Sequence, residues 1–475
     1  MNKFSLRTAE LFREPLKSPA RISKSPQISD PPRALRALAS IVNNDLCHRC
    51  GTCVGICPTD ALDIDYCEYP SIKNLTACTD CNLCVKVCPG DEFKAQEIAG
   101  EFFDCQYDIN DIHGFFTSAY LSHATDNRIR QEATSGGTVT ALLVHLLESG
   151  AIDGAIVVSS DENILWKGKP ILALSKEEIL AATKSKYSIV GTNSVLKTIR
   201  NRDGRYAVVG LPCHIHGIQK ARLLDKRICD RVVLTIGLLC HAAIEHDAFE
   251  VIWQSLGDYR NDAKKFISRV GKHPGTPHVV LADGSLMPVY FSKMRKFRPT
   301  SMDMINILYR LFTPARCLTC YDATAEFADI AVGDPWMKSP ASDIDFYEGY
   351  SYVLTRNKKA QELLEKAEKE KALKLIPLNQ TAARTCNRIM GKEKRLRAFR
   401  LLTTRKRQGL PIPNYGFLPS RPKFADRIHT ELNLLSHLFC FAKKGRRLLL
   451  RIMLSPAGYP LLWLNHLRRK YIMKK

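Results

Sequence analysis

CHRCGTCVGICP at residues 47–58 and CTDCNLCVKVCP at residues 78–89 repeat one cysteine pattern, C-x2-C-x2-C-x3-C-P. In this pattern three closely spaced thiolates hold one 4Fe-4S cluster, and the fourth thiolate crosses to a second cluster. A structural zinc site would need only two CxxC pairs. We therefore predict a ferredoxin module with two clusters. The spacing assigns one cluster to Cys47, Cys50, Cys53 and Cys88, and the other to Cys57, Cys78, Cys81 and Cys84.

The composition is that of a globular protein with reduced cysteines. The chain has 475 residues, of which 45% are apolar, enough for two or three globular units. Nine of its 17 cysteines lie between residues 47 and 88, and no apolar secretion signal follows Met1. We therefore expect free thiols in a reducing, cytoplasmic compartment.

The positive charge is unevenly distributed. The formal net charge is +22, yet residues 376–475 alone carry 23 Lys and Arg residues against three acids, and residues 1–40 carry eight against three. The stretch between them is close to neutral. We interpret the basicity as a property of two appended segments rather than of the body.

Beyond the cysteine motifs, helices alternate with short apolar strands. SGGTVTALLVHLLESG (135–150) has leucines at helical spacing. The runs GAIVVS (154–159), YAVVG (206–210) and VVLTIGLLC (232–240) are typical of buried strands. Because such strands alternate with helices, the predicted fold class is α/β, multidomain, with a mainly parallel sheet.

Four further cysteines lie in this second part of the chain. Cys213 and Cys240 directly follow predicted strands, and Cys317 and Cys320 form a CxxC pair. Parallel α/β folds bind ligands at the carboxyl ends of their strands, where four thiolates would suit a third 4Fe-4S cluster. Two alternatives stay open at this point: buried structural thiols at the first two positions, and zinc or no metal at the CxxC pair.

An ordered set of motifs resembles the beta subunit of coenzyme F420 hydrogenases and dehydrogenases. The motifs extend over residues 115–375 and are SGGTVTALL (135–143), IDGAIVV (152–158), TKSKY (183–187), VVGLPCHIHGIQK (208–220), IGLLC (236–240), CLTCYD (317–322), ADIAVGD (328–334) and GYSYVLTR (349–356). The resemblance implies FAD and an iron–sulfur cluster in the body, with the four cysteines as its ligands. It also implies hydride exchange with coenzyme F420.

One motif departs from the archaeal hydrogenase subunits. AVGDPW (331–336) is closer to bacterial relatives, some of which are associated with polysaccharide pathways. The identity of the hydride partner is therefore open between coenzyme F420 or a similar carrier and a lipid- or polysaccharide-linked substrate.

A flavin is required on chemical grounds if hydrides are involved, because a cluster carries one electron and a hydride delivers two. The backbone N–H groups before the predicted helix at 138–148 are suited to the flavin or its pyrophosphate. The TKSKY motif would add charge and stacking. The alternatives are an ordinary turn and a solvated Lys run. The candidate FAD contacts are Ser135, Gly136, Gly137, Thr138, Lys186 and Tyr187, and no residue is assigned a catalytic role.

The leading function is therefore an iron–sulfur flavoprotein oxidoreductase. It would pass electrons between a hydride carrier, FAD and the 4Fe-4S clusters, and on to a redox partner protein. The alternatives are a ferredoxin-driven reductase of a lipid- or polysaccharide-linked substrate and a non-catalytic electron relay. His214, His216 and His241 lie beside candidate cluster ligands and would tune potential or relay protons, unless they are structural.

The C-terminal stretch mixes apolar and basic residues. Residues 437–475 contain no run of uncharged apolar residues long enough to span a bilayer. We predict that residues 420–475 dock on an anionic membrane surface at its cytoplasmic face. A cover for the body's own core and an acidic partner are the alternatives, and nothing favours nucleic acid. The predicted parts are a basic tail (1–40), the ferredoxin domain (41–95), a flavin-binding part (115–200), a part with the body cysteines (201–375) and a basic helical extension (376–475).

Overall fold

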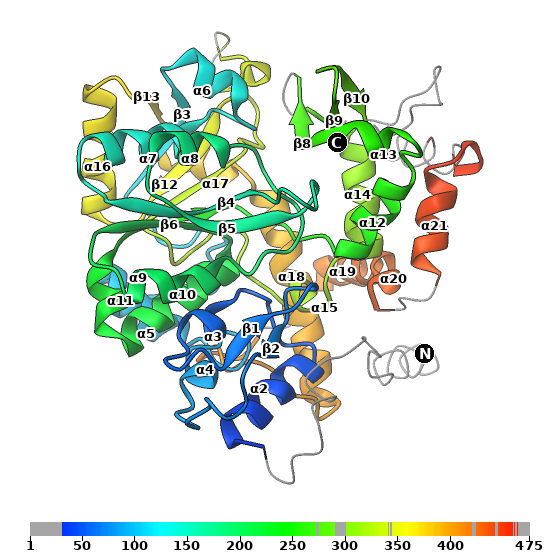
Figure 1. Ribbon diagram of the computed structural model, residues 1–475. Coiled ribbons are helices and arrows are strands. Elements are labelled where there is room, and N and C mark those ends of the chain that lie inside the picture. The colour runs from blue at the N-terminus through cyan, green and yellow to red at the C-terminus, as the bar shows by residue number, and fades with distance from the viewer. Residues whose placement is uncertain are drawn as a thin grey trace.

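The computed structural model shows one molecule in which the ferredoxin module lies against a larger α/β body (Figure 1). The structure describes residues 31–271, 275–289, 301–340, 342, 344–419, 424–441, 445–458, 460 and 463. Most of the predicted basic tail, residues 1–30, and part of the predicted membrane-docking stretch lie outside this range. Within the described part, no helix has the length and apolarity required to cross a bilayer.

The ferredoxin module has the same local structure twice. In each cysteine motif a short helix follows a residue in the left-handed conformation, Gly51 (φ 80°) in the first and Asn82 (φ 61°) in the second. Such a residue lets the chain turn sharply between two cysteines. The elements are α2 (Arg33–Asn43), α3 (Thr52–Gly55), β1 (Leu62–Ile64), β2 (Pro70–Ile72) and α4 (Leu83–Lys86), with β1 and β2 antiparallel.

The body is built on an eight-stranded sheet in the order β13-β3-β12-β11-β7-β6-β4-β5. The pairs β4/β6, β6/β7 and β7/β11 are parallel, and the strands outside them pair antiparallel. The α/β fold class is therefore confirmed, with the parallel part at the centre. The strands are β3 (Ser118–Ala124), β4 (Gly154–Ser160), β5 (Gly168–Ala173), β6 (Tyr206–Gly210), β7 (Val232–Leu238), β11 (Ile330–Gly333), β12 (Ser351–Thr355) and β13 (Leu373–Pro377).

Helices cover both faces of this sheet (Figure 1). One face packs against α7 and α16 through a core that includes Leu142, Val157 and Leu364. The other packs against α10 through Val208, Ile215 and other apolar residues. The helices involved are α5 (Ala95–Phe103), α6 (Asn127–Glu132), α7 (Thr138–Glu148), α8 (Lys176–Ala181), α9 (Leu196–Arg200), α10 (Pro212–Leu224), α11 (Lys226–Arg231) and α16 (Lys358–Lys369).

A small antiparallel sheet with its own helices forms a second layer beside the body. Its core includes Phe249 and Leu308, and α21 adds Leu450 and Met453 to it. Basic residues of α21 also pair with α12, Arg446 with Asp247 at 2.6 Å among them. The elements are α12 (His246–Gln254), α13 (Tyr259–Asp262), β8 (Ala263–Val270), β9 (Thr276–Leu281), β10 (Leu286–Pro288), α14 (Ser301–Phe312) and α21 (Arg446–Met453).

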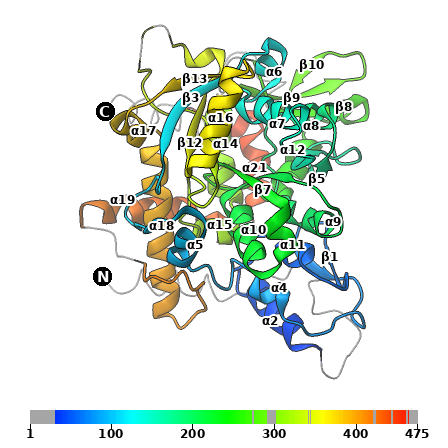
Figure 2. The same cartoon turned by 90° about the vertical axis from the view of Figure 1, so that its left-hand side faces the viewer.

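The basic segment after residue 376 is not simply appended. Its longest helix, α18 (Arg388–Arg407), runs alongside the body toward the ferredoxin module (Figures 1 and 2). Lys394, Arg395 and Arg397 on this helix are buried. The interpretation of the basicity as a property of appended segments is therefore wrong for α18. The remaining helices are α15 (Ala315–Leu318), α17 (Gln380–Thr385), α19 (Phe424–Ser436) and α20 (Leu438–Phe441), with short 3-10 turns at Thr192–Val195, Phe346–Glu348 and Pro456–Gly458.

The ferredoxin module is joined to the body through buried polar contacts. The side-chain amide of Asn193 donates to the hydroxyl of Thr52 at 2.8 Å, and its backbone N–H donates to the carbonyl of Cys50 at 2.9 Å. Gly55 lies so close that a Cβ atom there would be 2.1 Å from the Asn193 carbonyl oxygen. Only glycine fits this approach. The cysteines of the module are thereby held at a fixed place on the body.

Candidate redox site

The two cysteine motifs of the module exchange one cysteine each. Cys47, Cys50, Cys53 and Cys88 line a single enclosed space beside α2, which contributes Leu38 to it. Burial, with the charges of its neighbours Cys81, Cys57 and Cys78, raises the pKa of Cys84 to about 12. The first motif thus meets Cys88 of the second motif, and the second meets Cys57 of the first. Cys81 is exposed at the surface.

The four body cysteines come together from distant segments. Cys213 lies in the first turn of α10, Cys240 just after β7, and Cys317 and Cys320 at α15. All four line one cavity. Within the described residues, no three His, Cys, Asp or Glu side chains converge on one point as ligands of a single metal ion would. The thiols surround a space instead.

The buried environment of these thiols disfavours their deprotonation when no metal or cation is present. Burial raises the pKa of Cys213 well above its usual range, and the charges of Cys50, Cys317, Cys320 and Cys240 raise it further. Burial likewise raises the pKa of Cys240 to about 12, against the lowering effect of Lys394. Four deprotonated thiols here would need a metal or a set of cations to offset their charge.

Lys394 supplies such a cation, and no motif in the sequence indicated its role. Its Nζ donates to the carbonyl oxygens of Cys240 (2.7 Å) and Asp322 (2.6 Å), and it lines the cavity of the body cysteines. The available signal was weak. Gly391, Ala398 and Leu402 share the helix face of Lys394 by spacing, which indicates a buried face of α18.

The candidate flavin contacts lie mostly in one cavity of about 320 Å³ at the carboxyl ends of β6, β7 and β11. Ser135, Gly137, Thr138, Lys186 and Tyr187 line it. Gly136 does not. It lies against the backbone, since a Cβ there would be 2.4 Å from the Ser122 carbonyl oxygen.

Two segments of this cavity are tied to each other. The backbone N–H of Ser185 donates to the hydroxyl of Thr134 at 2.9 Å. Gly137 precedes α7 with φ 76°, so the chain turns tightly at the start of the helix. Lys186 turns its Nζ to the carbonyl oxygens of Ala182 and Thr183 at 2.8 and 2.7 Å, and burial lowers its pKa to about 7.

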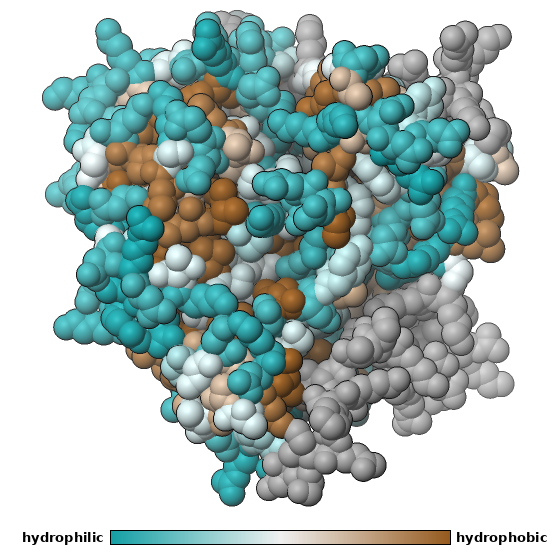
Figure 3. Space-filling model, viewed as in Figure 1, coloured by the Kyte–Doolittle hydropathy of each residue, from teal (hydrophilic) through white to brown (hydrophobic). Residues whose placement is uncertain are grey.

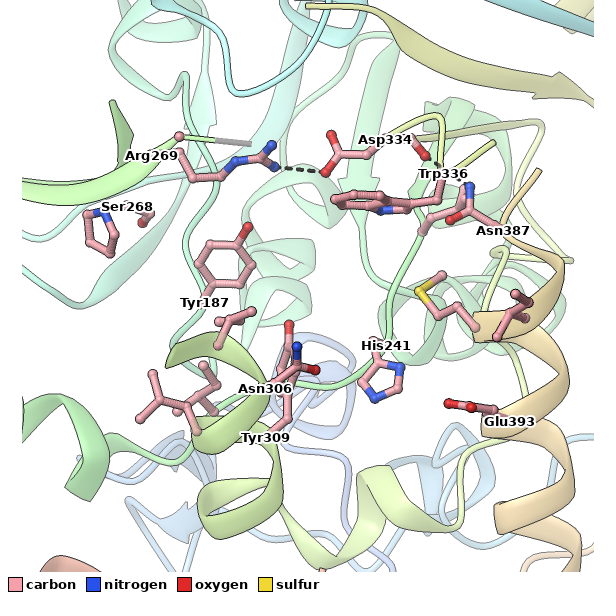
Figure 4. Close-up of a pocket in the computed structure, with 18 of the residues that line it drawn as sticks. Tyr187, His241, Ser268, Arg269, Asn306, Tyr309, Asp334, Trp336, Asn387 and Glu393 are labelled. Atoms are coloured by element: carbon pink, nitrogen blue, oxygen red, sulfur yellow. Dashed lines mark hydrogen bonds and ion pairs between the residues drawn. The ribbon is translucent and has the colours of Figure 1, made fainter. Parts of the chain in front are cut away.

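A second cavity, of about 490 Å³, opens beside the first (Figure 4). Tyr187, Tyr309 and Trp336 give it aromatic walls, and Arg269 pairs with Asp334 at 2.9 Å across its upper edge. Of these residues only Tyr187 was expected from the sequence to contact FAD. Asp334 lies within the AVGDPW motif that departs from the archaeal pattern.

The cavities form a continuous series. His241 and Tyr187 line both the Figure 4 cavity and the flavin cavity. Cys240 lines both the flavin cavity and the cavity of the body cysteines. Cys47 and His48 line the last of these, and both also border the space inside the first ferredoxin motif. Each compartment therefore shares a wall with the next.

Of the three histidines that neighbour the cysteines, His214 and His216 are buried, and His241 is partly buried. Burial lowers the pKa of His214 to about 4, and its Nδ1 accepts the Leu211 backbone N–H at 3.1 Å. His216 pairs with Asp322 at 3.0 Å and stacks on Phe93. These two have structural partners, whereas His241 faces two cavities.

Comparison with known proteins places this site in a family. Residues 119–197 match the N-terminal part, and residues 203–381 the C-terminal part, of the family described as coenzyme F420 hydrogenase/dehydrogenase beta subunit. The chain belongs to this family. Residues 39–101 match a 4Fe-4S dicluster domain. The resemblance noted from the motifs is thereby confirmed, and the chain is an iron–sulfur member of an oxidoreductase family.

Two named relatives and one solved structure show how similar this chain is to other family members. The coenzyme F420-dependent sulfite reductase of Methanocaldococcus jannaschii is 26% identical over 71% of this chain, which spans only half of that protein. The coenzyme F420 hydrogenase subunit beta of Methanosarcina barkeri is 28% identical over 54% of this chain and 79% of its own length. A solved chain of the F420-reducing NiFe hydrogenase complex from Methanosarcina barkeri is 24% identical, with a TM-score of 0.48 over 63% of this chain and 96% of its own.

The family match includes the body cysteines but not α18. Cys213, Cys240, Cys317 and Cys320 all lie within residues 203–381. Lys394, which lines the same cavity, lies beyond the matched residues. This beta-subunit family member therefore adds a side chain from its C-terminal segment to the cysteine cavity.

Proposed function

We propose that this chain passes electrons between a hydride carrier, FAD and three 4Fe-4S clusters, and on to a redox partner protein. The observation that carries the proposal is the series of cavities with shared walls, which leads from the Figure 4 cavity to the ferredoxin module. The relatives named for coenzyme F420 favour this coenzyme or a similar deazaflavin as the carrier.

The residues of the 320 Å³ cavity suit FAD. The turn at Ser135 and Gly137 brings backbone N–H groups to the start of α7, where a pyrophosphate is favoured by the helix dipole. Tyr187 offers an aromatic ring to the same cavity, and Lys186 lines it with its Nζ held by the backbone carbonyls of Ala182 and Thr183. When bound, FAD supplies the coupling between two-electron hydride chemistry and the one-electron clusters.

The cysteine sets suit cubane clusters. The thiols of the first ferredoxin set line one space, and so do the four body thiols. In the second ferredoxin set, the charges of Cys57, Cys78 and Cys81 act on Cys84. The body set also has the buried Lys394 ammonium beside it. The charge of the Lys394 ammonium offsets part of the negative charge that four thiolates bring. A 4Fe-4S cluster uses four such ligands.

The redox partner would dock where the series reaches the surface. Among the module cysteines, Cys81 is exposed, while Cys50, Cys53, Cys84 and Cys88 are buried. The second ferredoxin cluster is therefore the one that a partner protein can approach. The relatives that are subunits of hydrogenase and dehydrogenase enzymes make a protein partner the natural acceptor or donor.

Anaerobic purification with cofactor analysis tests the proposal. We expect about twelve iron atoms, from three four-iron clusters, and about one FAD per chain. Reduced coenzyme F420 should then bleach the flavin and reduce the clusters. Protein that binds neither FAD nor FMN would indicate a relay. Protein that binds FAD but exchanges no electrons with the deazaflavin would indicate a different substrate, such as a lipid- or polysaccharide-linked one.

The turn before α7 gives a sharper test of the flavin site. We expect Gly137→Ala to weaken FAD binding by about tenfold, or about 1.4 kcal/mol, because a Cβ at φ 76° strains the turn that borders the cavity. Gly150→Ala is the matched control, since Gly150 has φ 66°, follows the same helix and faces open space. Fluorescence titration of FAD would measure both, and equal affinities would contradict the assigned contact.

Contact with an anionic membrane surface stays a prediction. The packing of α21 limits which of its side chains could reach a lipid surface. Arg446 of α21 is buried in its pair with Asp247 of α12, so it does not face outward. The exposed side of α21 carries two arginines, Arg447 and Arg451, and the apolar Leu448 and Ile452. Figure 3 shows brown surface over this helix at the right-hand edge.

Liposome co-sedimentation tests this surface. We expect Leu448→Asp with Ile452→Asp to lower binding to anionic vesicles several-fold, because both side chains are exposed on α21 and would be the ones to enter the interface. Leu286→Asp is the control, since Leu286 is similarly exposed on the small sheet. Binding that is equal in all variants would rule out α21 as the contact.

A further inference from the structure

Two cations of α18 lie buried beside the body cysteines. Lys394 and Arg397 are each 1% exposed. Lys394 Nζ is fixed by the carbonyl oxygens of Cys240 and Asp322. The Nε, Nη1 and Nη2 atoms of Arg397 have no hydrogen-bond partner within the described residues. Burying such groups is strongly unfavourable unless an anion lies nearby.

The carboxylate of Asp322, whose backbone carbonyl binds Lys394, is already engaged. Asp322 accepts a hydrogen bond from His216 at 3.0 Å and from the backbone N–H groups of Thr324 and Glu326. The charges that most favour the Lys394 ammonium are those of Cys320 and Cys240, ahead of Asp322. For Arg397 the largest favourable charge is that of Cys317. The body cysteines are therefore the main negative groups that offset the buried charges of Lys394 and Arg397 on α18.

We propose that Lys394 raises the reduction potential of the body cluster. Reduction adds one negative charge to a cluster, and a fixed buried cation close to it favours the reduced form. The inference rests on the proposed function, because it takes the four body cysteines as cluster ligands. It makes Lys394 a positioning residue and gives α18 a role in the redox centre.

The first ferredoxin motif offers an internal comparison. Lys220 Nζ donates to the carbonyl oxygens of Cys88 (3.1 Å) and Glu92 (2.5 Å), much as Lys394 does at Cys240. The side-chain charges of Glu92 and Asp91 lie close to Lys220 and offset it. At Lys394 the carboxylate with the largest effect is Asp322, which His216 and two backbone N–H groups already engage. Of these two lysines, Lys394 is therefore the one whose charge is less offset by carboxylates.

The test is a redox titration of the holoprotein, followed by EPR spectroscopy under anaerobic conditions. The body-cluster signal is the one that Cys213→Ser removes. We expect Lys394→Met to lower the equilibrium constant for reduction of that cluster roughly tenfold, which is about 59 mV for a one-electron couple. The ferredoxin clusters should keep their potentials. Lys220→Met is the control and should leave the body cluster unchanged.

Each outcome decides a different point. A body-cluster potential that is unchanged in Lys394→Met, with iron content retained, overturns the inference. If that variant loses iron, Lys394→Arg decides, since it keeps the charge and must keep the wild-type potential; a lowered potential in Lys394→Arg also overturns the inference. Wild-type protein with about eight iron atoms and no third signal instead overturns the body cluster of the proposed function.

Discussion

Cys213→Ser should lower the iron content from about twelve to about eight atoms per chain, because one of three four-iron clusters loses a ligand. Cys213 is enclosed by α10 and the neighbouring cysteines, so no water-exposed group nearby can replace it easily. Since Cys240 lies between the flavin cavity and this site, electron transfer from a hydride carrier to the ferredoxin clusters should be lost as well. Iron and sulfide quantitation with stopped-flow spectroscopy would measure both effects.

Cys229→Ser serves as the matched control for this variant. Cys229 is a half-buried thiol on α11 and lines none of the four cavities in the series. It should keep all its iron and its rate of cluster reduction. In Cys213→Ser, dithionite should still reduce the two ferredoxin clusters, because it acts on them directly. Full iron content in Cys213→Ser would remove the third cluster from the proposal.

The features that the sequence predicts well are local or strictly periodic. The approach of Cys88 to the first motif, with which it lines one space, follows from a cysteine spacing that recurs twice, and the ligand roles of Cys57 and Cys88 stay predictions. The strands β4, β6 and β7 follow from short β-branched runs with clear ends, and their parallel pairing follows from the helices between them. In both cases the information lies in short segments that are close to each other in the sequence.

The features that it misses depend on contacts between distant segments. Lys394 reaches Cys240 across 154 residues of sequence, and a count of charges cannot tell a buried lysine from an exposed one. Arg269 approaches Tyr187 only because the small sheet folds against the body, and Trp336 reaches the same cavity from the segment after β11. No motif links these residues, so the Figure 4 cavity was not predictable. The unusual AVGDPW sequence indicated one segment of this cavity but not the residues that face it.

The junction between module and body gives the second large expected effect. Arg49 donates to both carboxylate oxygens of Glu245, at 2.8 and 2.6 Å, and its guanidinium also lies 4.4 Å from the centre of the Tyr69 ring. The two side chains are only 4% and 12% exposed. Arg49→Met should therefore lower the free energy of unfolding by about 3–5 kcal/mol, because it leaves the Glu245 carboxylate buried without its partner.

The double variant Arg49→Met with Glu245→Gln separates the lost ion pair from the lost packing. It should recover most of the stability, since the remaining buried group is neutral. The single variant should also respond to pH. Loss of the Arg49 cation should raise the pKa of the buried Glu245 carboxyl, so the folded variant binds more protons than the unfolded chain, and its stability should increase as pH falls. Anaerobic denaturant unfolding, followed by fluorescence and by cluster absorbance, would measure these differences. A single variant as stable as the wild type at every pH would mean that the other contacts between module and body, such as those of Asn193 and Lys220, hold the module without this ion pair.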